Sequence, residues 1–221
     1  MNHTKKATKA VNKAYIILKK AYGPQGWWPI GGEYHPKIYS LDERDRYEVC
    51  LGAILTQNTA WTNVVTALSN LERISIGYID RLSDSELRKR IRPAGYFNQK
   101  TRKIRAYNTY HRKLGGNAPT REGLLSVWGI GPETADSILL YAFQKPTFVV
   151  DAYTRRLFNR MGLIDCGFNY DDIKKLVEDL LPRDHRTYNE FHALIVEHSK
   201  RFCTKNPRCC GCPLNGMCER I

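Results

Sequence analysis

The chain has 221 residues, of which 42% are hydrophobic, so it can bury a sizeable core as one large domain or two small ones. Its 35 lysines and arginines outnumber 22 acidic residues, which gives a formal net charge of +13. This composition excludes a disordered chain and favours a polyanionic partner, nucleic acid ahead of a membrane surface. Charge alone leaves a merely soluble basic protein open as the alternative.

The first 23 residues are rich in lysine and predict an amphipathic helix that lies on the core. Their longest apolar run, AYIIL, is too short for the apolar region of a signal peptide or for a membrane span. We therefore expect an intracellular protein, in the cytoplasm and nucleoid or in the nucleus, with no membrane partner and with reduced thiols. The apolar positions that recur at helical spacing are Val11, Ala14, Tyr15, Leu18 and Tyr22.

The rest of the sequence predicts an all-α protein. Ser83 and Glu86 have the spacing of a capping box at a helix start, and Gly115 with Gly116 ends a basic helix. The run FVV at 148–150 is too short to build a sheet. The segment 22–40 is a long loop whose aromatic content favours a functional role over disorder. The predicted helices are 46–55, 83–91, 100–114, 121–127, 132–143, 148–160, 171–181 and 189–201.

Residues 124–140, LLSVWGIGPETADSILL, predict two helices joined by a tight hairpin. Gly129 and Gly131 permit backbone angles that a side chain would forbid, and Pro132 fits the first turn of the second helix. The free amides of the hairpin and of that helix start form a site for an anion. Such a hairpin can hold a DNA phosphate without reading sequence. An ordinary corner between two helices would also use Gly-x-Gly.

Residues 128–163, WGIGPETADSILLYAFQKPTFVVDAYTRRLFNRMGL, resemble the hairpin and catalytic segment of the endonuclease III superfamily of DNA glycosylases. The resemblance extends from about Trp27 to Cys218. It implies two helical domains, a barrel-like one of residues 40–145 with the hairpin and one of 1–39 plus 146–221, with the active site in the cleft between them. It also implies a monomeric enzyme whose partner is double-stranded DNA with a damaged base.

This family places an aspartate eighteen residues beyond a fixed hairpin position, and here Glu133 holds that position and Asp151 is the aspartate. A carboxylate can stabilise the oxocarbenium-like charge on the sugar and orient or deprotonate a water. An aspartate before a helix is also an ordinary N-cap. Family members that nick the backbone use a lysine at the hairpin position to form a Schiff base, which Glu133 cannot form. The resemblance therefore implies a monofunctional glycosylase; Lys145 is near in sequence, but nothing places it on the sugar.

Gln57, in ILTQNTAW at 54–61, matches the glutamine with which the family fills the space left by a flipped base. Chemistry on a base requires its extrusion from the stack, and a polar side chain helps to offset the lost pairing. The alternative is a glutamine at a helix end that is exposed to water.

Five of the seven cysteines lie between residues 203 and 218, which indicates a metal site rather than disulfides. Four of them have the spacing C-x5-C-x2-C-x5-C, which resembles the superfamily's [4Fe–4S] loop, although the first gap there is usually one residue longer. Zinc ribbons more often pair two C-x2-C motifs. An alternative set would use Cys210 in place of Cys209, with gaps of six residues and one residue. The single residue between Cys210 and Cys212 leaves little room for both to bind one site, so Cys210 is left out. The cluster is expected to shape a loop that presents Lys205 and Arg208 to phosphates. The predicted ligands are Cys203, Cys209, Cys212 and Cys218.

Trp27, Trp28 and Pro29, together with Tyr47, resemble the aromatic pocket of the 3-methyladenine branch of this superfamily. A cationic N-alkylated purine stacks well on aromatic faces and is already a good leaving group. The alternative is that both tryptophans belong to the core. The resemblance thus implies a glycosylase for alkylated purines such as 3-methyladenine. The other hypotheses are a glycosylase for oxidised pyrimidines or mismatched bases with weak lyase activity, and a non-catalytic module that binds damaged DNA.

Overall fold

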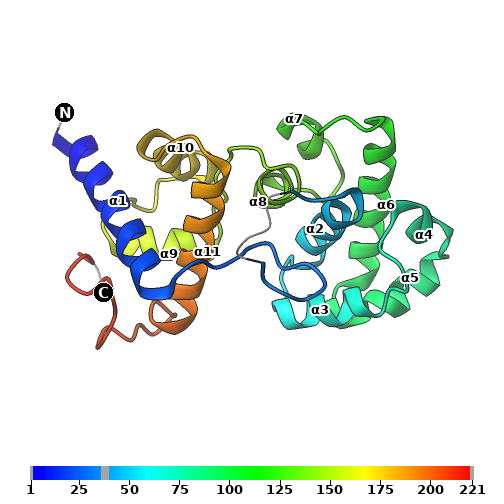
Figure 1. The fold of residues 1–221 in the computed structure, drawn as a ribbon, viewed down its shortest axis with the longest axis horizontal. Coiled ribbons are helices and arrows are strands. Elements are labelled where there is room, and N and C mark those ends of the chain that lie inside the picture. Colours follow the sequence, from blue (N-terminus) through cyan, green and yellow to red (C-terminus); the bar gives the residue numbers. More distant parts are fainter. Residues whose placement is uncertain (1, 36–39, 220–221) are drawn as a thin grey trace. The chain divides into compact units, whose positions relative to one another are not determined.

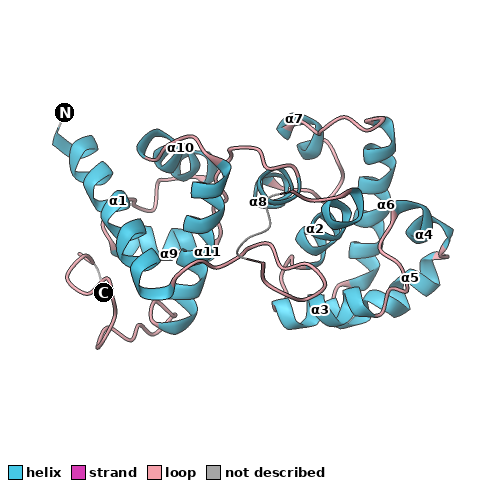
Figure 2. Ribbon diagram, in the orientation of Figure 1, coloured by secondary structure: helices cyan, strands magenta, loops and turns pink. Residues whose placement is uncertain are grey.

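The computed structural model describes residues 2–35 and 40–219, and the side chains from Ala7 onward. Residues 36–39 of the predicted long loop lie outside the described part. The described chain is helical and holds no strand, only an isolated bridge between Ile30 and Glu33 (Figure 2). The prediction of an all-α protein is confirmed. No helix among the described residues is long and apolar enough to cross a membrane.

The helices follow the predicted order, with three elements that were not predicted, two helices within residues 61–81 and a short 3-10 helix at 92–94. The elements are α1 (Asn2–Tyr22), α2 (Glu43–Leu55), α3 (Trp61–Ser69), α4 (Ile76–Arg81), α5 (Asp84–Ile91), η1 (Arg92–Ala94), α6 (Phe97–Lys113), α7 (Arg121–Leu125), α8 (Pro132–Ser137), η2 (Ile138–Ala142), α9 (Ala152–Arg160), α10 (Tyr170–Leu180) and α11 (His185–Arg201).

The chain divides into two compact units. Unit 1 is Met1–Trp27 with Lys145–Ile221, and unit 2 is Trp28–Gln144. The predicted domains differ from these units in assigning residues 28–39 to the part that contains the N-terminal helix and Lys145 to the part that contains the hairpin. The division of the chain into these two predicted domains remains a prediction.

Unit 1 is built around α11, against which the N-terminal helix packs. In Figure 1 the blue helix α1 runs beside the orange helix α11, and both α1 and α9 contact α11. Val11, Ala14 and Leu18 of α1 are fully buried, and Tyr15 places its ring edge-on against Phe191 at 5.5 Å. The apolar stripe of the lysine-rich segment therefore covers the core of unit 1, as its periodicity predicts.

The segment 148–160 is helical only from Ala152, so the prediction is wrong for its first residues. Phe148, Val149 and Val150 are buried and belong to no helix. Side chains of α10 take the place of helical partners, because the Phe148 amide donates to Glu178 at 2.8 Å and the Val150 amide donates to the Tyr170 hydroxyl at 3.4 Å. This buried, non-helical run leads directly to Asp151, which is the N-cap of α9.

Unit 2 surrounds α2, whose residues from Tyr47 to Leu55 are buried and contact η2, α6 and α3. The capping box predicted at α5 is confirmed, because Ser83 and Glu86 bond reciprocally. The helix after the hairpin begins with Pro132 as predicted, but it changes after Ser137 into the π-helix η2, which is buried throughout.

Candidate active site

The hairpin between α7 and α8 depends on one of its glycines more than on the other. Gly129 has φ +80°, and a Cβ on it would lie 2.6 Å from Cγ of Lys103. Gly131 has φ −94° as the N-cap of α8, a conformation open to any residue, and a Cβ there would meet nothing within 4 Å. The prediction of special backbone angles thus holds for Gly129 and is wrong for Gly131. The hairpin glycines and the start of α8 are exposed.

Gln57 lies directly against this hairpin. Its Nε2 donates to the Gly129 carbonyl at 3.2 Å and to the Thr134 hydroxyl at 2.8 Å. Its Oε1 accepts from Nζ of Lys103 on α6. Burial lowers the pKa of the Lys103 ammonium. Gln57 was predicted from the sequence, but Lys103 and Thr134 were not, because nothing in the local sequence marks those two residues.

Glu133 is exposed in the first turn of α8, one residue before Thr134. A carboxylate is favourable there because the helix start carries partial positive charge. The structure thus presents a carboxylate, rather than an amine, at the hairpin position where lyases of the resembled family carry lysine.

Asp151 caps α9 and faces a histidine. Its Oδ1 accepts from the Thr154 amide at 2.7 Å, and its Oδ2 lies 3.4 Å from Nε2 of His192 on α11. Burial alone would raise the pKa of Asp151, but the proximity of His192 and the hydrogen bonds from Thr154 outweigh burial and hold the pKa below its ordinary value. The carboxylate is therefore ionised at neutral pH although its side chain is only 13% exposed.

His192 also connects Asp151 to one of the predicted aromatic residues. The Trp27 ring meets the His192 ring edge-on at 5.7 Å, and Asn189 donates to the Trp27 carbonyl at 2.8 Å. Trp27, His192 and Asp151 therefore form a continuous row of contacts within unit 1. His192 was not predicted from the sequence, where its only mark is that it is a histidine within the predicted helix 189–201.

The other predicted aromatic residues make separate contacts in unit 2. The Trp28 ring packs on Gly52 of α2, and its centroid lies 5.1 Å from that of Trp61 and 5.0 Å from that of Tyr141. Pro29 is buried. Tyr47 is buried on another side of α2, where its hydroxyl donates to Asn108 Oδ1 at 2.8 Å. Burial raises the pKa of Tyr47 far above its usual range. Trp28 and Tyr47 are thus not brought together.

The four predicted cysteine ligands lie near one another in the loop after α11. Burial is the largest cause that raises the pKa of the Cys212 and Cys218 thiols. The neighbouring thiols raise it further, those of Cys209 and Cys203 for Cys212 and those of Cys203, Cys212 and Cys209 for Cys218. Cys210 is exposed and not among them. No set of three or more His, Cys, Asp or Glu side chains in the described part of the chain is arranged as a metal site.

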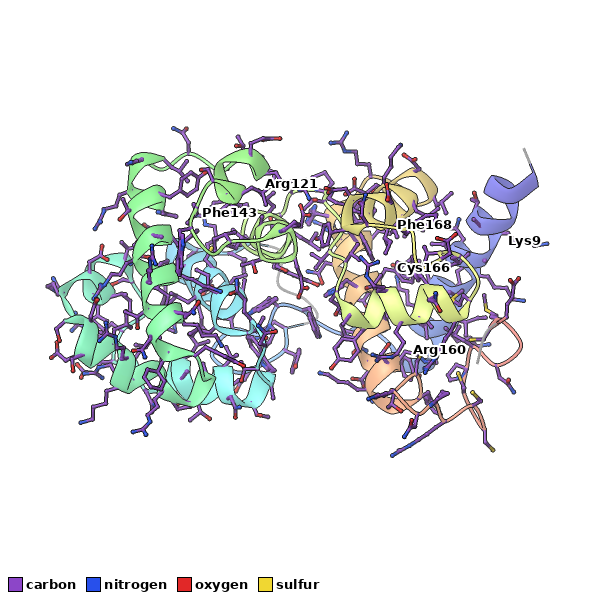
Figure 3. All side chains as sticks on the ribbon, turned by 180° about the vertical axis from the view of Figure 1, so that it is seen from behind. Lys9, Arg121, Phe143, Arg160, Cys166 and Phe168 are labelled. Atoms are coloured by element: carbon purple, nitrogen blue, oxygen red, sulfur yellow. The ribbon has the colours of Figure 1, made fainter. Side chains whose placement is uncertain are left out.

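Nitrogen donors from two helices of unit 1 reach this loop. Nη1 of Arg160 on α9, labelled in Figure 3, donates to Cys203 Sγ at 3.2 Å, and Nε2 of His198 lies 3.7 Å from Cys212 Sγ. These groups would offset negative charge on sulfur. The donor set therefore fits a thiolate-bound cluster in its chemistry. Lys205 and Arg208 are exposed on the same loop.

Comparison with known proteins gives one family. The profile of the HhH-GPD superfamily of base excision DNA repair proteins matches residues 51–183. A protein of Methanocaldococcus jannaschii, provisionally named DNA repair glycosylase MJ1434, is 42% identical over 225 residues, which cover 94% of this chain and 95% of that protein.

Two solved structures share the fold. The H. pylori 3-methyladenine DNA glycosylase MagIII, bound to 1,N6-ethenoadenine, is 30% identical with a TM-score of 0.67, over 90% of this chain and 97% of that one. A non-covalent complex of endonuclease III with DNA has a TM-score of 0.78 at 20% identity, over 96% and 95% of the two chains, which is a likeness of fold alone.

Proposed function

The chain belongs to the HhH-GPD superfamily of base excision DNA repair proteins, within the endonuclease III superfamily of DNA glycosylases, and from that premise we propose a monofunctional glycosylase for alkylated purines. One observation carries the proposal. The ionised carboxylate of Asp151, which is mostly shielded from solvent, lies 3.4 Å from His192, and the ring of Trp27 packs against the same histidine. The charge needed for hydrolysis is therefore connected to an aromatic ring through one residue.

Asp151 would supply the chemistry. As the glycosidic bond breaks, positive charge develops on the sugar, and a carboxylate in partly desolvated surroundings stabilises that charge more than water would. The same carboxylate can take the proton of the attacking water. Its Oδ1 is held by the Thr154 amide, so the orientation of the group is set before substrate binds.

His192 would act as a positioning residue for Asp151. Replacing it by leucine removes the donor beside Oδ2, which raises the pKa of Asp151. A base with a higher pKa is protonated at higher pH, so the acidic limb of the pH profile of kcat/KM should move to higher pH. His192→Gln retains an N–H donor and should move the limb less. If the acidic limb of the kcat/KM profile lies at the same pH in both variants and in the wild type, this role is contradicted.

The similarity to MagIII and the ring of Trp27 support alkylated purines as substrates. An electron-poor N-alkylated purine gains from stacking and cation–π attraction, and it leaves readily without acid catalysis. To test the substrate, release of free bases from methylated and from oxidised DNA is measured side by side. We expect 3-methyladenine as the favoured product. Strong release of thymine glycol with alkylpurines untouched would overturn the substrate while leaving the glycosylase.

Glu133 supports a single activity, because a carboxylate cannot form the imine that precedes strand cleavage. Borohydride should therefore trap little protein on a damaged duplex, and strand breaks should appear only after alkali or heat. Glu133→Lys provides the informative comparison, since it restores an amine at that position. Efficient trapping of the wild type would show that another amine performs the lyase step.

We also propose that Cys203, Cys209, Cys212 and Cys218 hold a [4Fe–4S] cluster, which would shape the loop without entering the reaction. Purified protein should be brown, with broad absorbance near ~400 nm and about four irons per chain. Cys212→Ser should lose iron, whereas the matched variant Cys210→Ser should retain it. A colourless, active protein with one zinc would contradict the cluster.

A further inference from the structure

We propose that Tyr22 and His198 act as a pair that donates one N–H hydrogen bond to the sulfur of Cys212 and thereby raises the reduction potential of the cluster. The inference rests on the proposed function, in which Cys212 is one of the four ligands of a [4Fe–4S] cluster. It adds two positioning residues outside the cysteine set, and one of them lies on the N-terminal helix.

The imidazole ring of His198 has a polar contact on each of its two nitrogens, and both contacts lie within unit 1. Its Nε2 lies 3.7 Å from Cys212 Sγ, a distance at which an N–H can donate to sulfur. Its Nδ1 lies 3.0 Å from the hydroxyl of Tyr22, the last residue of α1. The ring therefore connects the end of α1 to the loop that carries the predicted ligands.

The chemistry of these two neighbours determines which nitrogen carries the hydrogen. His198 is 1% exposed and its ring is stacked with that of Phe202 at 5.9 Å, surroundings that favour the neutral imidazole. A neutral imidazole has one N–H and one lone pair, whereas a metal-bound thiolate can only accept. Nε2 must therefore carry the hydrogen, and Nδ1 accepts from the Tyr22 hydroxyl.

Neighbouring groups hold both members of the pair in place. The His198 carbonyl accepts from the amides of Phe202 at 2.8 Å and of Cys203 at 3.2 Å, so the same residue also fixes the start of the cysteine-rich loop. The guanidinium of Arg201 lies over the Tyr22 ring at 5.1 Å. The N–H is thus aimed at the ligand sulfur by fixed surroundings, as is usual for groups that orient metal ligands.

A hydrogen bond to a ligand sulfur affects the reduced cluster more than the oxidised one. Reduction adds one electron, part of that charge falls on the sulfurs, and an N–H donor therefore stabilises the reduced form and raises the potential. The Tyr22 hydroxyl strengthens the effect, because donation to Nδ1 polarises the ring and makes Nε2–H a better donor. Both residues should act on the potential in the same direction.

The test measures the cluster rather than base excision. Voltammetry of the complete, iron-loaded protein on a graphite electrode, which supplies the electron, gives the one-electron potential. His198→Leu should lower the equilibrium constant for reduction about threefold to tenfold, as expected for one net hydrogen bond. At about 59 mV per tenfold change for one electron, this is a potential roughly 30–60 mV lower.

Matched variants separate the hydrogen bond from the volume of the side chain. Tyr22→Phe keeps the ring and should lower the potential by a smaller amount, and His198→Gln keeps an N–H donor and should lower it less than His198→Leu. Tyr15→Phe on α1 and His185→Leu on α11 make the same chemical changes elsewhere in unit 1 and should leave the potential unchanged. Iron analysis and thermal melting confirm that each variant is loaded and folded.

The outcomes separate this inference from the cluster on which it rests. If His198→Leu and Tyr22→Phe retain iron and have the wild-type potential, the inference is overturned and the cluster stands. If His198→Leu does not retain iron, Tyr22→Phe decides, since it removes only a hydroxyl: a lower potential supports the pair and an unchanged one overturns it. Wild-type protein that contains no iron would instead contradict the proposed cluster.

Discussion

Replacing Asp151 by asparagine is expected to lower the rate of base release by roughly 10²–10⁴-fold, because the variant loses both the negative charge and the base. The start of α9 should be unaffected. Asparagine is as good an N-cap as aspartate, and its oxygen can still accept from the Thr154 amide. Single-turnover release of bases from methylated DNA measures the loss, and the affinity for the same DNA should change little.

Asp184 provides the matched control for this substitution. It caps α11 in the same unit, where its Oδ2 accepts from the Thr187 amide at 2.9 Å, as Asp151 does for Thr154. Asp184→Asn makes the same chemical change at a helix start and should leave base release near the wild-type rate. If Asp184→Asn loses as much activity as Asp151→Asn, the effect is structural and the catalytic role of Asp151 fails.

Trp28→Ala is expected to lower the free energy of unfolding of unit 2 by about 2–4 kcal/mol, somewhat less than for a fully buried ring. The lost packing on Gly52, Trp61 and Tyr141 is the reason. Thermal melting measures the change, which should lower the melting temperature by roughly 5–15 °C in a chain of this size. Trp128→Ala is the control, because that ring is 41% exposed and stacks on Arg102.

Trp27→Ala should show the opposite pattern, a large loss of activity with a small loss of stability. If its ring stacks on the extruded base, base release should fall roughly tenfold to a hundredfold, with a smaller change in stability. Together the two substitutions distinguish a core tryptophan from a pocket tryptophan. A Trp28→Ala variant that melts like the wild type but has lost activity would restore the sequence-based interpretation, in which both rings line the base pocket.

The sequence by itself determined the features that depend on neighbouring residues. The capping box of Ser83 and Glu86 and the amphipathic stripe of α1 both follow from side chains within a few positions of one another. Caps, turns and helical periodicity are local, so they can be predicted from a short stretch of chain. The family, too, was identifiable from one continuous segment.

The tertiary structure decided which residues share a contact. His192 reaches Asp151 from another helix, and Lys103 of α6 donates to Gln57, although neither pair is close in sequence. The buried, non-helical run before Asp151 depends on α10, whose side chains replace the missing helical hydrogen bonds. The separation of Trp28 from Tyr47 follows from the side of α2 on which each one packs. Such contacts arise from the packing of whole helices, which no local pattern specifies.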